Sequence, residues 1–207
     1  MADAPQTPPA AGPRRLILAS ASPRRREIML AAGLNFEVIP GCADEACLLA
    51  DGRAVAAVVA RRKAAEIWRQ TSGPRLVIGA DTVVAAPLDR GGEVLGKPSD
   101  ADDARRMLRL LSGATHEVHT GIALAWADGP DEPEATVRVV STHVTFRDLS
   151  AEEVEAYIAS GEPFDKAGAY GIQGGASIFV HRVVGSYHNV VGLPIDDLLE
   201  MLASAPA

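Results

Sequence analysis

Residues 76–86 read LVIGADTVVAA, an apolar run that one acidic residue, Asp81, interrupts. A short apolar run rich in valine predicts a buried strand. A carboxylate inside such a run must be paired, bound to a metal or placed at the exposed end of the strand, because a lone buried charge is costly. Gly79 and Ala80 precede it, and their small size is expected to leave room for a ligand. The alternative is an aspartate at a strand end that bonds only nearby backbone groups.

Strands and helices alternate on both sides of this run. We expect strands at residues 16–19, 36–39, 76–84, 94–95, 118–127, 136–146 and 177–184. We expect helices at residues 22–32, 51–69, 99–113 and 150–161, and a last one from residue 194, with Ser22, Ser99 and the Ser150–Glu153 capping box at three of the starts. Strands outnumber crossover helices and at least two pairs resemble hairpins. The order therefore predicts an α/β fold with a mixed, twisted β-sheet flanked by helices.

The composition is that of a globular protein, with 47% hydrophobic and 23% charged residues among 207 and a net charge of -7. The negative charge argues against sequence-independent binding to nucleic acid. No apolar run approaches the roughly 20 residues of a membrane span. Residues 1–13, MADAPQTPPAAGP, lack the apolar segment of a signal peptide and predict a disordered tail before a single domain at 14–207, in a cytoplasmic protein. Cys42 and Cys47 are expected to be free thiols, although their spacing also allows a disulfide or half of a metal site.

Residues 20–25, SASPRR, predict an anion site where a strand turns into a helix. The N-terminus of a helix carries unpaired N–H groups and about half a positive charge, so arginines in the first turn are unfavourable unless an anion binds there. Arg24 and Arg25 are therefore candidate phosphate ligands, together with the hydroxyls of Ser20 and Ser22. The alternative is a solvated basic turn with a serine cap.

Two lysines and a glycine-rich loop complete the candidate site. Lys63 lies on the apolar stripe of its helix, where a lysine either extends to solvent or meets an anion. Lys97 lies between Gly96 and Pro98, which would fix its direction. The loop FDKAGAYGIQG at 164–174 allows the backbone to approach a flat ligand closely, and the amide of Gln173 can both donate and accept hydrogen bonds. Taken singly, each lysine is more often structural, and the loop could be merely flexible.

These segments, in this order, resemble the Maf family of septum-formation-like nucleotide pyrophosphatases. The resemblance runs from Leu16 to Leu202 and rests on five motifs: ASASPRR, GADTVV, GKP followed by a helix and LSG, FDKAGAYGIQG, and SYHNVVGLP. It implies a mixed α/β sheet related to that of inosine-triphosphate pyrophosphatases, often dimeric. The intact DKAGAYGIQG is similar to that of the subgroup that hydrolyses dTTP and UTP.

The resemblance also implies roles for single residues. Asp81 corresponds to the proton acceptor, and Arg24, Thr82 and Gln173 match the positions that set substrate specificity. Glu45, which follows the second strand in ADE, matches with Lys63 and Lys97 the acidic and basic residues around the metal and the phosphates. The expected cofactor is a divalent cation, Mg or Mn, held by Glu45 and Asp81, since hard cations prefer oxygen ligands.

The resemblance and the chemistry together predict hydrolysis of a pyrimidine nucleoside triphosphate to the monophosphate and pyrophosphate. Asp81 would accept a proton from the attacking water, either directly or through the metal. One alternative is a pyrophosphatase for modified purine nucleotides such as 7-methyl-GTP. Another is a nucleotide-binding regulator of cell division without catalysis.

Overall fold

The computed structural model describes residues 14–43, 47, 49–126 and 133–205. The predicted tail at 1–13 and the predicted metal ligand Glu45 lie outside these residues. Described Cys42 and Cys47 are both free thiols, as expected. No helix among the described residues is long and apolar enough to cross a membrane.

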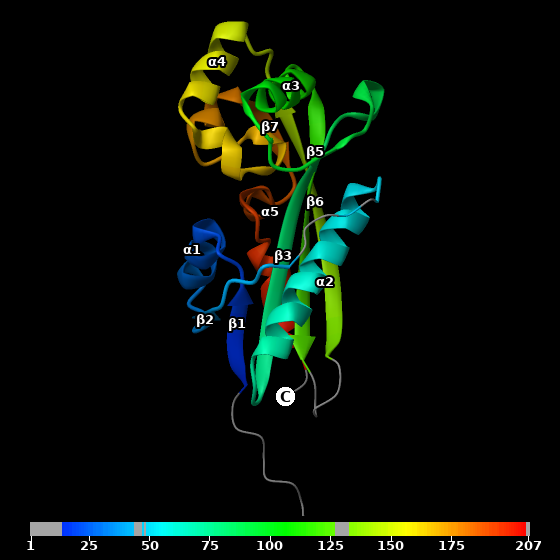
Figure 1. Cartoon of the computed structure of the whole chain (residues 1–207), viewed down its shortest axis with the longest axis vertical. Helices are drawn as coiled ribbons and strands as arrows, with labels where there is room; N and C mark the ends of the chain where they lie inside the picture. The colour runs from blue at the N-terminus through cyan, green and yellow to red at the C-terminus, as the bar shows by residue number, and fades with distance from the viewer. Residues whose placement is uncertain (1–13, 44–46, 48, 127–132, 206–207) are drawn as a thin grey trace, which may run out of the picture.

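In the described part of the chain, a mixed sheet of seven strands runs the length of the fold (Figure 1). Its path is β2-β1-β3-β5-β6-β7, and the short β4 pairs with β3 beside this path. β1 is parallel to β2 and β3, whereas the other pairs are antiparallel. The predicted mixed sheet is therefore confirmed, with strands at β1 Arg15–Ala19, β2 Glu37–Val38, β3 Arg75–Ala85, β4 Val94–Leu95, β5 Thr115–Trp126, β6 Glu134–Phe146 and β7 Val180–Val184.

Among the described residues, six α-helices flank the sheet: α1 Pro23–Ala31, α2 Gly52–Gln70, α3 Ala101–Leu111, α4 Ala151–Ala159, α5 Tyr187–Val191 and α6 Ile195–Ala203. The long α2 lies along the sheet beside β3 and β5 (Figure 1). Alternate residues of the strands face opposite sides, so Val77 packs with the apolar residues of α2 while Ile78 packs with those of α1 and α6. Both faces are covered, which explains why the strand sequences read as continuous apolar runs.

Another apolar cluster fills the other end of the sheet. There α3 and α4 pack with β4, the ends of β5 and β6, and the segment around Tyr170. Ser150 and Glu153 form the predicted capping box at the start of α4. Figure 1 shows α3, α4 and β7 gathered at this end, away from α1, β1 and β2.

Several predicted boundaries are wrong for local reasons. Asp100, not Ser99, caps α3, because its carboxylate accepts the N–H of Asp103. Ser22 occupies the N-cap position of α1 but its side chain makes no capping bond. β7 begins at Val180 because residues Gly175–Phe179 form a 3-10 turn instead of a strand. The short α5 was not predicted.

Glycines set how closely α2 approaches the sheet. A Cβ added to Gly79 would lie 2.1 Å from the carbonyl oxygen of Ala60, and one added to Gly121 would lie 2.3 Å from that of Ala56. The backbone of α2 therefore fills the space beside Gly79, so this glycine itself leaves no room for a ligand, although a cavity does lie beside Asp81. The close approach instead fixes the position of α2 over β3.

Candidate functional site

A notch interrupts one edge of β3. The pairing with β1 ends at Ala19–Gly79, and the pairing with β4 begins at Leu95–Val84. Among the described residues, no strand pairs with the intervening residues 80–83 on this edge. Asp81 and Thr82 point to opposite faces of the sheet, as neighbours on a strand do, yet both line one cavity.

This cavity has a volume of about 1330 Å³. It is bounded by the turn between β1 and α1, by β3, by residues 96–97 and by the loop at 165–174. The structure brings together here every described residue that the sequence assigned to the site: Ser20, Ser22, Arg24, Arg25, Lys63, Asp81, Thr82, Lys97 and Gln173.

Asp81 pairs with Lys63 across the face of the sheet that α2 covers. The Nζ of Lys63 donates to Oδ1 of Asp81 at 2.8 Å, and their side chains are only 14% and 13% exposed. The position of Lys63 on the apolar stripe of α2 thus places its ammonium group beside a carboxylate. Such a pairing is one of the ways in which a largely buried aspartate can be stabilised. The pair places one positive and one negative group at the wall of the cavity.

Arg25 occupies the other side of the notch. Its guanidinium donates to the carbonyl oxygens of Ala80 and Gly192, each at 2.8 Å. It also donates at 3.2 Å to the hydroxyls of Ser20 and Thr82. At least four of its five N–H donors thus have protein partners. This arrangement favours a role in bracing the site, and the predicted phosphate contact of Arg25 stays a prediction.

Thr82 lies opposite Thr120 of β5, and their hydroxyl oxygens are 2.9 Å apart. Thr120 in turn donates to the carbonyl oxygen of Asn189 in α5, also at 2.9 Å. Asn189 is fully buried and donates through Nδ2 to Val118 and Thr142. Polar contacts therefore connect Thr82 at the cavity wall to the middle of α5.

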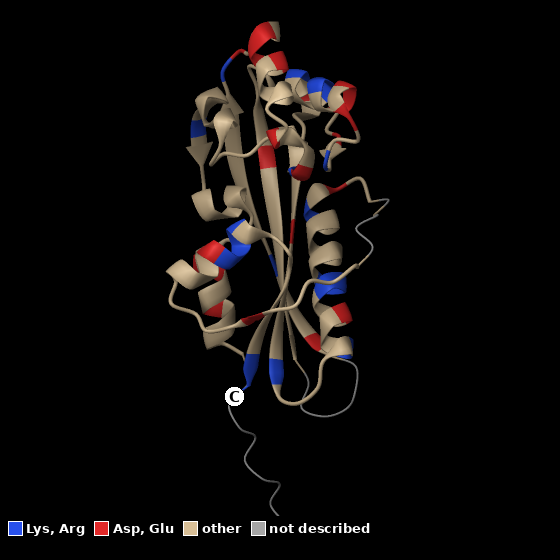
Figure 2. Cartoon of the chain, turned by 60° about the vertical axis from the view of Figure 1, so that its left-hand side comes forward, with Lys and Arg blue, Asp and Glu red and all other residues tan. Residues whose placement is uncertain are grey.

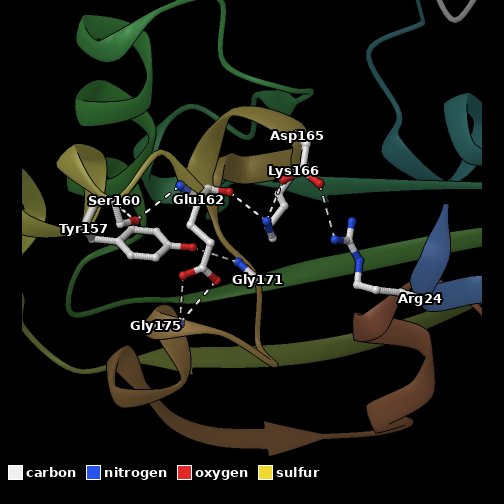
Figure 3. A network of polar contacts seen from close by, with 8 residues as sticks. All are labelled: Arg24, Tyr157, Ser160, Glu162, Asp165, Lys166, Gly171 and Gly175. Atoms are coloured by element: carbon white, nitrogen blue, oxygen red, sulfur yellow. Dashed lines mark hydrogen bonds and ion pairs between the residues drawn. The ribbon is translucent and has the colours of Figure 1, made fainter. Parts of the chain in front are cut away.

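A network of polar contacts holds the loop on the far side of the cavity (Figure 3). Arg24 reaches across from α1 to Asp165 at 3.4 Å, and Lys166 contacts the same carboxylate. Partial burial raises the pKa of Asp165, but the hydrogen bond and charge of Lys166, with a contribution from Arg24, outweigh it and the net pKa is lowered. Asp165 is therefore an anion at neutral pH.

The backbone of the loop is bonded as well. The carboxylate of Glu162 accepts the N–H of Gly175, and the hydroxyl of Tyr157 accepts that of Gly171 (Figure 3). Burial is the main cause that raises the pKa of Tyr157 to about 12, so its hydroxyl stays protonated. These bonds bracket residues 171–174, the stretch that contains Gln173, so the alternative of a merely flexible loop is not favoured.

Tyr170 anchors the same loop in the core. Its hydroxyl lies 2.8 Å from Nε2 of His116, and both rings pack edge to face against Phe146. Burial lowers the pKa of His116 to about 3, so the imidazole is neutral in the folded protein. The preceding Ala169 has a φ of 60°, a left-handed conformation that side chains rarely adopt. Such strain is concentrated at functional segments.

The described residues can accommodate a divalent cation only with help from a ligand. No group of three or more His, Cys, Asp and Glu side chains that could hold a metal occurs in the described part of the chain. Asp81 supplies one carboxylate at the cavity wall, and Mg²⁺ commonly binds through one or two carboxylates plus substrate phosphates and water. The donor set therefore fits a cation that arrives with a polyphosphate.

Charges elsewhere are interspersed. Figure 2 shows acidic and basic positions interspersed among uncharged ones along the elements of the fold. Many are paired, such as Arg138 with Glu200 and Arg147 with Glu153.

Residues 15–205 match the pattern of a family described as "Maf-like protein". The chain belongs to the Maf family. Proteins named dTTP/UTP pyrophosphatase are similar to this Maf chain over most of its length. The one from Geotalea uraniireducens is 48% identical over 188 residues, which are 90% of this chain and 93% of that protein. The one from Thermococcus kodakarensis is 48% identical over 181 residues (87% and 92%), and the one from Salmonella typhimurium 46% over 189 residues (91% of each).

Two solved structures share weaker likeness with this Maf chain. A HAM1 protein from Coxiella burnetii gives a TM-score of 0.49 at 15% identity, over 93% of this chain and all of that one. A nucleoside-triphosphatase, dITP/XTP pyrophosphatase, from Mycobacterium abscessus gives 0.44 at 14% identity, over 93% and 98%. Scores this low add nothing to the fold class, which rests on the mixed sheet itself.

Sequence reasoning missed the second layer of the Maf site. Thr120 and Asn189 are fully buried polar residues, and Glu162, Tyr157 and His116 hold the loop. A signal for Thr120 does exist: it interrupts the apolar segment VHTGIALA in a strand that is buried on both faces. For Glu162 and Tyr157 the local sequence carries no such signal, because their partners are backbone groups brought close only by the tertiary fold.

Proposed function

We propose that this chain is a nucleoside triphosphate pyrophosphatase that hydrolyses dTTP and UTP to the monophosphate and pyrophosphate. The observation that carries the proposal is the Lys63–Asp81 pair at the wall of a cavity whose rim also holds Arg24 and Lys97. A carboxylate among cations is what a phosphoanhydride hydrolase requires. The names of the relatives at 46–48% identity support the choice of substrate.

Asp81 is the proposed proton acceptor. Lys63 donates a hydrogen bond to one oxygen of its carboxylate, which orients the group at the cavity wall. The attacking water is expected to lose its proton to this carboxylate as it approaches the α-phosphorus. When bound, a divalent cation, Mg or Mn, would supply positive charge to the phosphate oxygens, with Asp81 and the predicted ligand Glu45 as the residues that hold it.

The basic side chains are proposed to act on the pyrophosphate leaving group. Pyrophosphate gains negative charge as it leaves, and fixed cations stabilise that charge without reorganising. Lys63 and Lys97 approach the cavity from α2 and from the segment before α3, and Arg24 approaches from α1. Ser20 and Ser22 stand in the turn between β1 and α1 and complete the proposed phosphate site.

Base recognition falls to the glycine-rich loop. Uracil and thymine present an acceptor, O4, beside a donor, N3–H, and the side-chain amide of Gln173 can form a hydrogen bond with each. Gln173 lies in the turn between Gly171 and Gly174, whose backbones are bonded to each other at 3.1 Å. The bonds that Tyr157 and Glu162 make on either side support a fixed backbone for this reader.

The test is pyrophosphate release from a panel of natural and modified nucleoside triphosphates with Mg or Mn. We expect dTTP and UTP to give the highest specificity constants and Asp81→Asn to abolish release while the melting temperature stays near that of the wild type. Preference for 7-methyl-GTP would instead support a purine pyrophosphatase. Binding without release of pyrophosphate from any member of the panel would support a regulator and overturn the proposal. Action in the cytoplasm and assembly as a homodimer stay predictions.

A further inference from the structure

The hydroxyl groups around Thr82 can be assigned donor and acceptor roles from their partners alone. The hydroxyl of Thr120 lies 2.9 Å from the backbone carbonyl oxygen of Asn189, which can only accept. Thr120 therefore donates its single hydroxyl proton to that oxygen. The contact of 2.9 Å between the two threonine hydroxyls then requires Thr82 to donate and Thr120 to accept. Arg25 can only donate, so its 3.2 Å contact occupies one lone pair of Thr82.

The result is a relay with one direction: Arg25 to Thr82, Thr82 to Thr120, and Thr120 to Asn189. Its inner members are well enclosed, since Thr120 and Asn189 are both 0% exposed. Asn189 is itself fixed, because Nδ2 donates to the carbonyl of Val118 and to the hydroxyl of Thr142, each at 2.9 Å. Ser186 caps α5 by accepting the N–H of Asn189. The acceptor end of the relay therefore cannot turn without disturbing β5, β6 and α5 together.

We propose that Thr120 is a positioning residue that fixes the Thr82 hydroxyl as a hydrogen-bond acceptor toward the cavity, so that the nucleotide group Thr82 meets must be a donor. The inference rests on the proposed function and deepens it. The proton of Thr82 is held by Thr120, and Arg25 takes one of its two lone pairs. What remains to face the cavity is the second lone pair.

Two hydrogen-bond donors that could meet Thr82 are present in both dTTP and UTP. One is N3–H of the base, and the other is the 3′-hydroxyl of the sugar. The 2′-hydroxyl is excluded as the shared partner because dTTP lacks it. CTP has an acceptor at N3, and 3′-deoxy-UTP lacks the 3′-hydroxyl, so these two nucleotides distinguish the two sources.

The experiment compares Thr120→Val with Thr120→Ser. Valine preserves the volume and removes the acceptor for Thr82, whereas serine preserves the hydroxyl and loses only a methyl group. The carbonyl of Asn189 keeps a partner in either variant, since the backbone N–H of Gly192 also donates to it at 3.1 Å. Specificity constants, with KM and kcat separated, are measured for UTP, CTP and 3′-deoxy-UTP, and thermal melting monitors the fold. Thr120→Ala serves in place of the valine variant if that protein does not fold.

We expect Thr120→Val to lower the specificity constant for UTP about tenfold, mainly through KM, because Thr82 can now turn its proton into the cavity. Thr120→Ser should restore it to within about threefold of the wild type. Thr120→Val should not further lower the specificity constant for the nucleotide that lacks the contacted donor. If that nucleotide is CTP, the donor is N3–H; if it is 3′-deoxy-UTP, the donor is the 3′-hydroxyl. Equal losses on all three nucleotides, or no loss in a folded variant, would overturn the inference. Failure of the wild-type protein to release pyrophosphate from UTP would instead refute the proposed function, so the two failures are distinguishable.

Discussion

Lys63 and Asp81 form an ion pair whose geometry depends on two glycines, Gly79 and Gly121, at the contact between α2 and the sheet. The pair joins α2 to β3 at 2.8 Å. Gly79 and Gly121 let the backbone of α2 lie directly on the two strands, and Gly121 is the register partner of Asp81. The position of the lysine is thus set by the distance between a helix and a sheet.

Replacing Gly79 by alanine should therefore disturb both stability and activity. The added methyl group would overlap the carbonyl oxygen of Ala60, and overpacking of this kind costs about 1–3 kcal/mol. Because α2 must move away, Lys63 moves from Asp81 and turnover per folded molecule should also fall. Gly96→Ala is the matched control for stability, since nothing lies within 4 Å of its added Cβ. Urea unfolding and pyrophosphate release check both, and equal stability of the two variants would contradict the packing argument.

Arg24→Ala should weaken activity far more than folding. Arg24 stands in the first turn of α1, where its charge opposes the helix dipole, and its ion pair with Asp165 is exposed and worth at most about 1 kcal/mol. Removing it should change the free energy of unfolding by less than about 1 kcal/mol and lower the specificity constant for UTP roughly tenfold or more.

Asp165→Asn is the control for that variant, because it removes the charge that pairs with Arg24, and with Lys166, but keeps the arginine. Its specificity constant for UTP should stay within about threefold of the wild type. If the two variants lost activity equally, the ion pair, and not the cation, would be the important feature.

His116 makes the stability of the protein depend on pH. In the unfolded chain the imidazole has a pKa near 6.5, and burial lowers the pKa to about 3 in the folded protein. Between these values only the unfolded state binds the proton, so the stability present above pH 6.5 is lost as the pH falls toward 3. The loss is about 1.4 kcal/mol per pH unit.

His116→Gln keeps an amide to bond the Tyr170 hydroxyl but cannot titrate. Between pH 7.5 and 5.5 the variant should therefore lose about 1 kcal/mol less stability than the wild type in urea unfolding. Identical losses would show that other groups carry the pH dependence; burial also lowers the pKa of His119, which remains in the variant.

Gln173→Glu should shift base preference from pyrimidine toward guanine. A carboxylate accepts the adjacent donors N1–H and the 2-amino group of guanine but cannot donate to O4 of uracil. Turnover of UTP is expected to fall by about two orders of magnitude, with a smaller gain for GTP because neighbouring residues set the space for the ring. An unchanged ratio of the UTP and GTP specificity constants would show that Gln173 only braces the loop.

The periodic parts of the sequence predicted the fold well. Apolar runs located β3, β5 and β6, and the stripe on α2 correctly indicated that Lys63 faces inward. The predicted site residues that the structure describes do line one cavity. What the sequence could not predict depends on contacts between distant segments: the notch between β1 and β4, the commitment of Arg25 to carbonyl oxygens, and the relay through Thr120. The errors at Ser99 and at the start of β7 arose where two neighbouring residues could each cap or extend an element.

The notch in β3 leaves a backbone amide where a ligand can shield it. The carbonyl of Ala80 points out of the notch toward Arg25, and residues two apart on a strand direct their peptide groups to the same edge, so the N–H of Thr82 points there as well. Hydrogen–deuterium exchange reports such shielding. Nucleotide binding should slow exchange at the amide of Thr82 while leaving Ile78, which pairs with Leu18 of β1, unchanged. Equal slowing at both would indicate that the whole sheet stiffens; slowing confined to Thr82 would mean that the bound nucleotide stands where a neighbouring strand is missing.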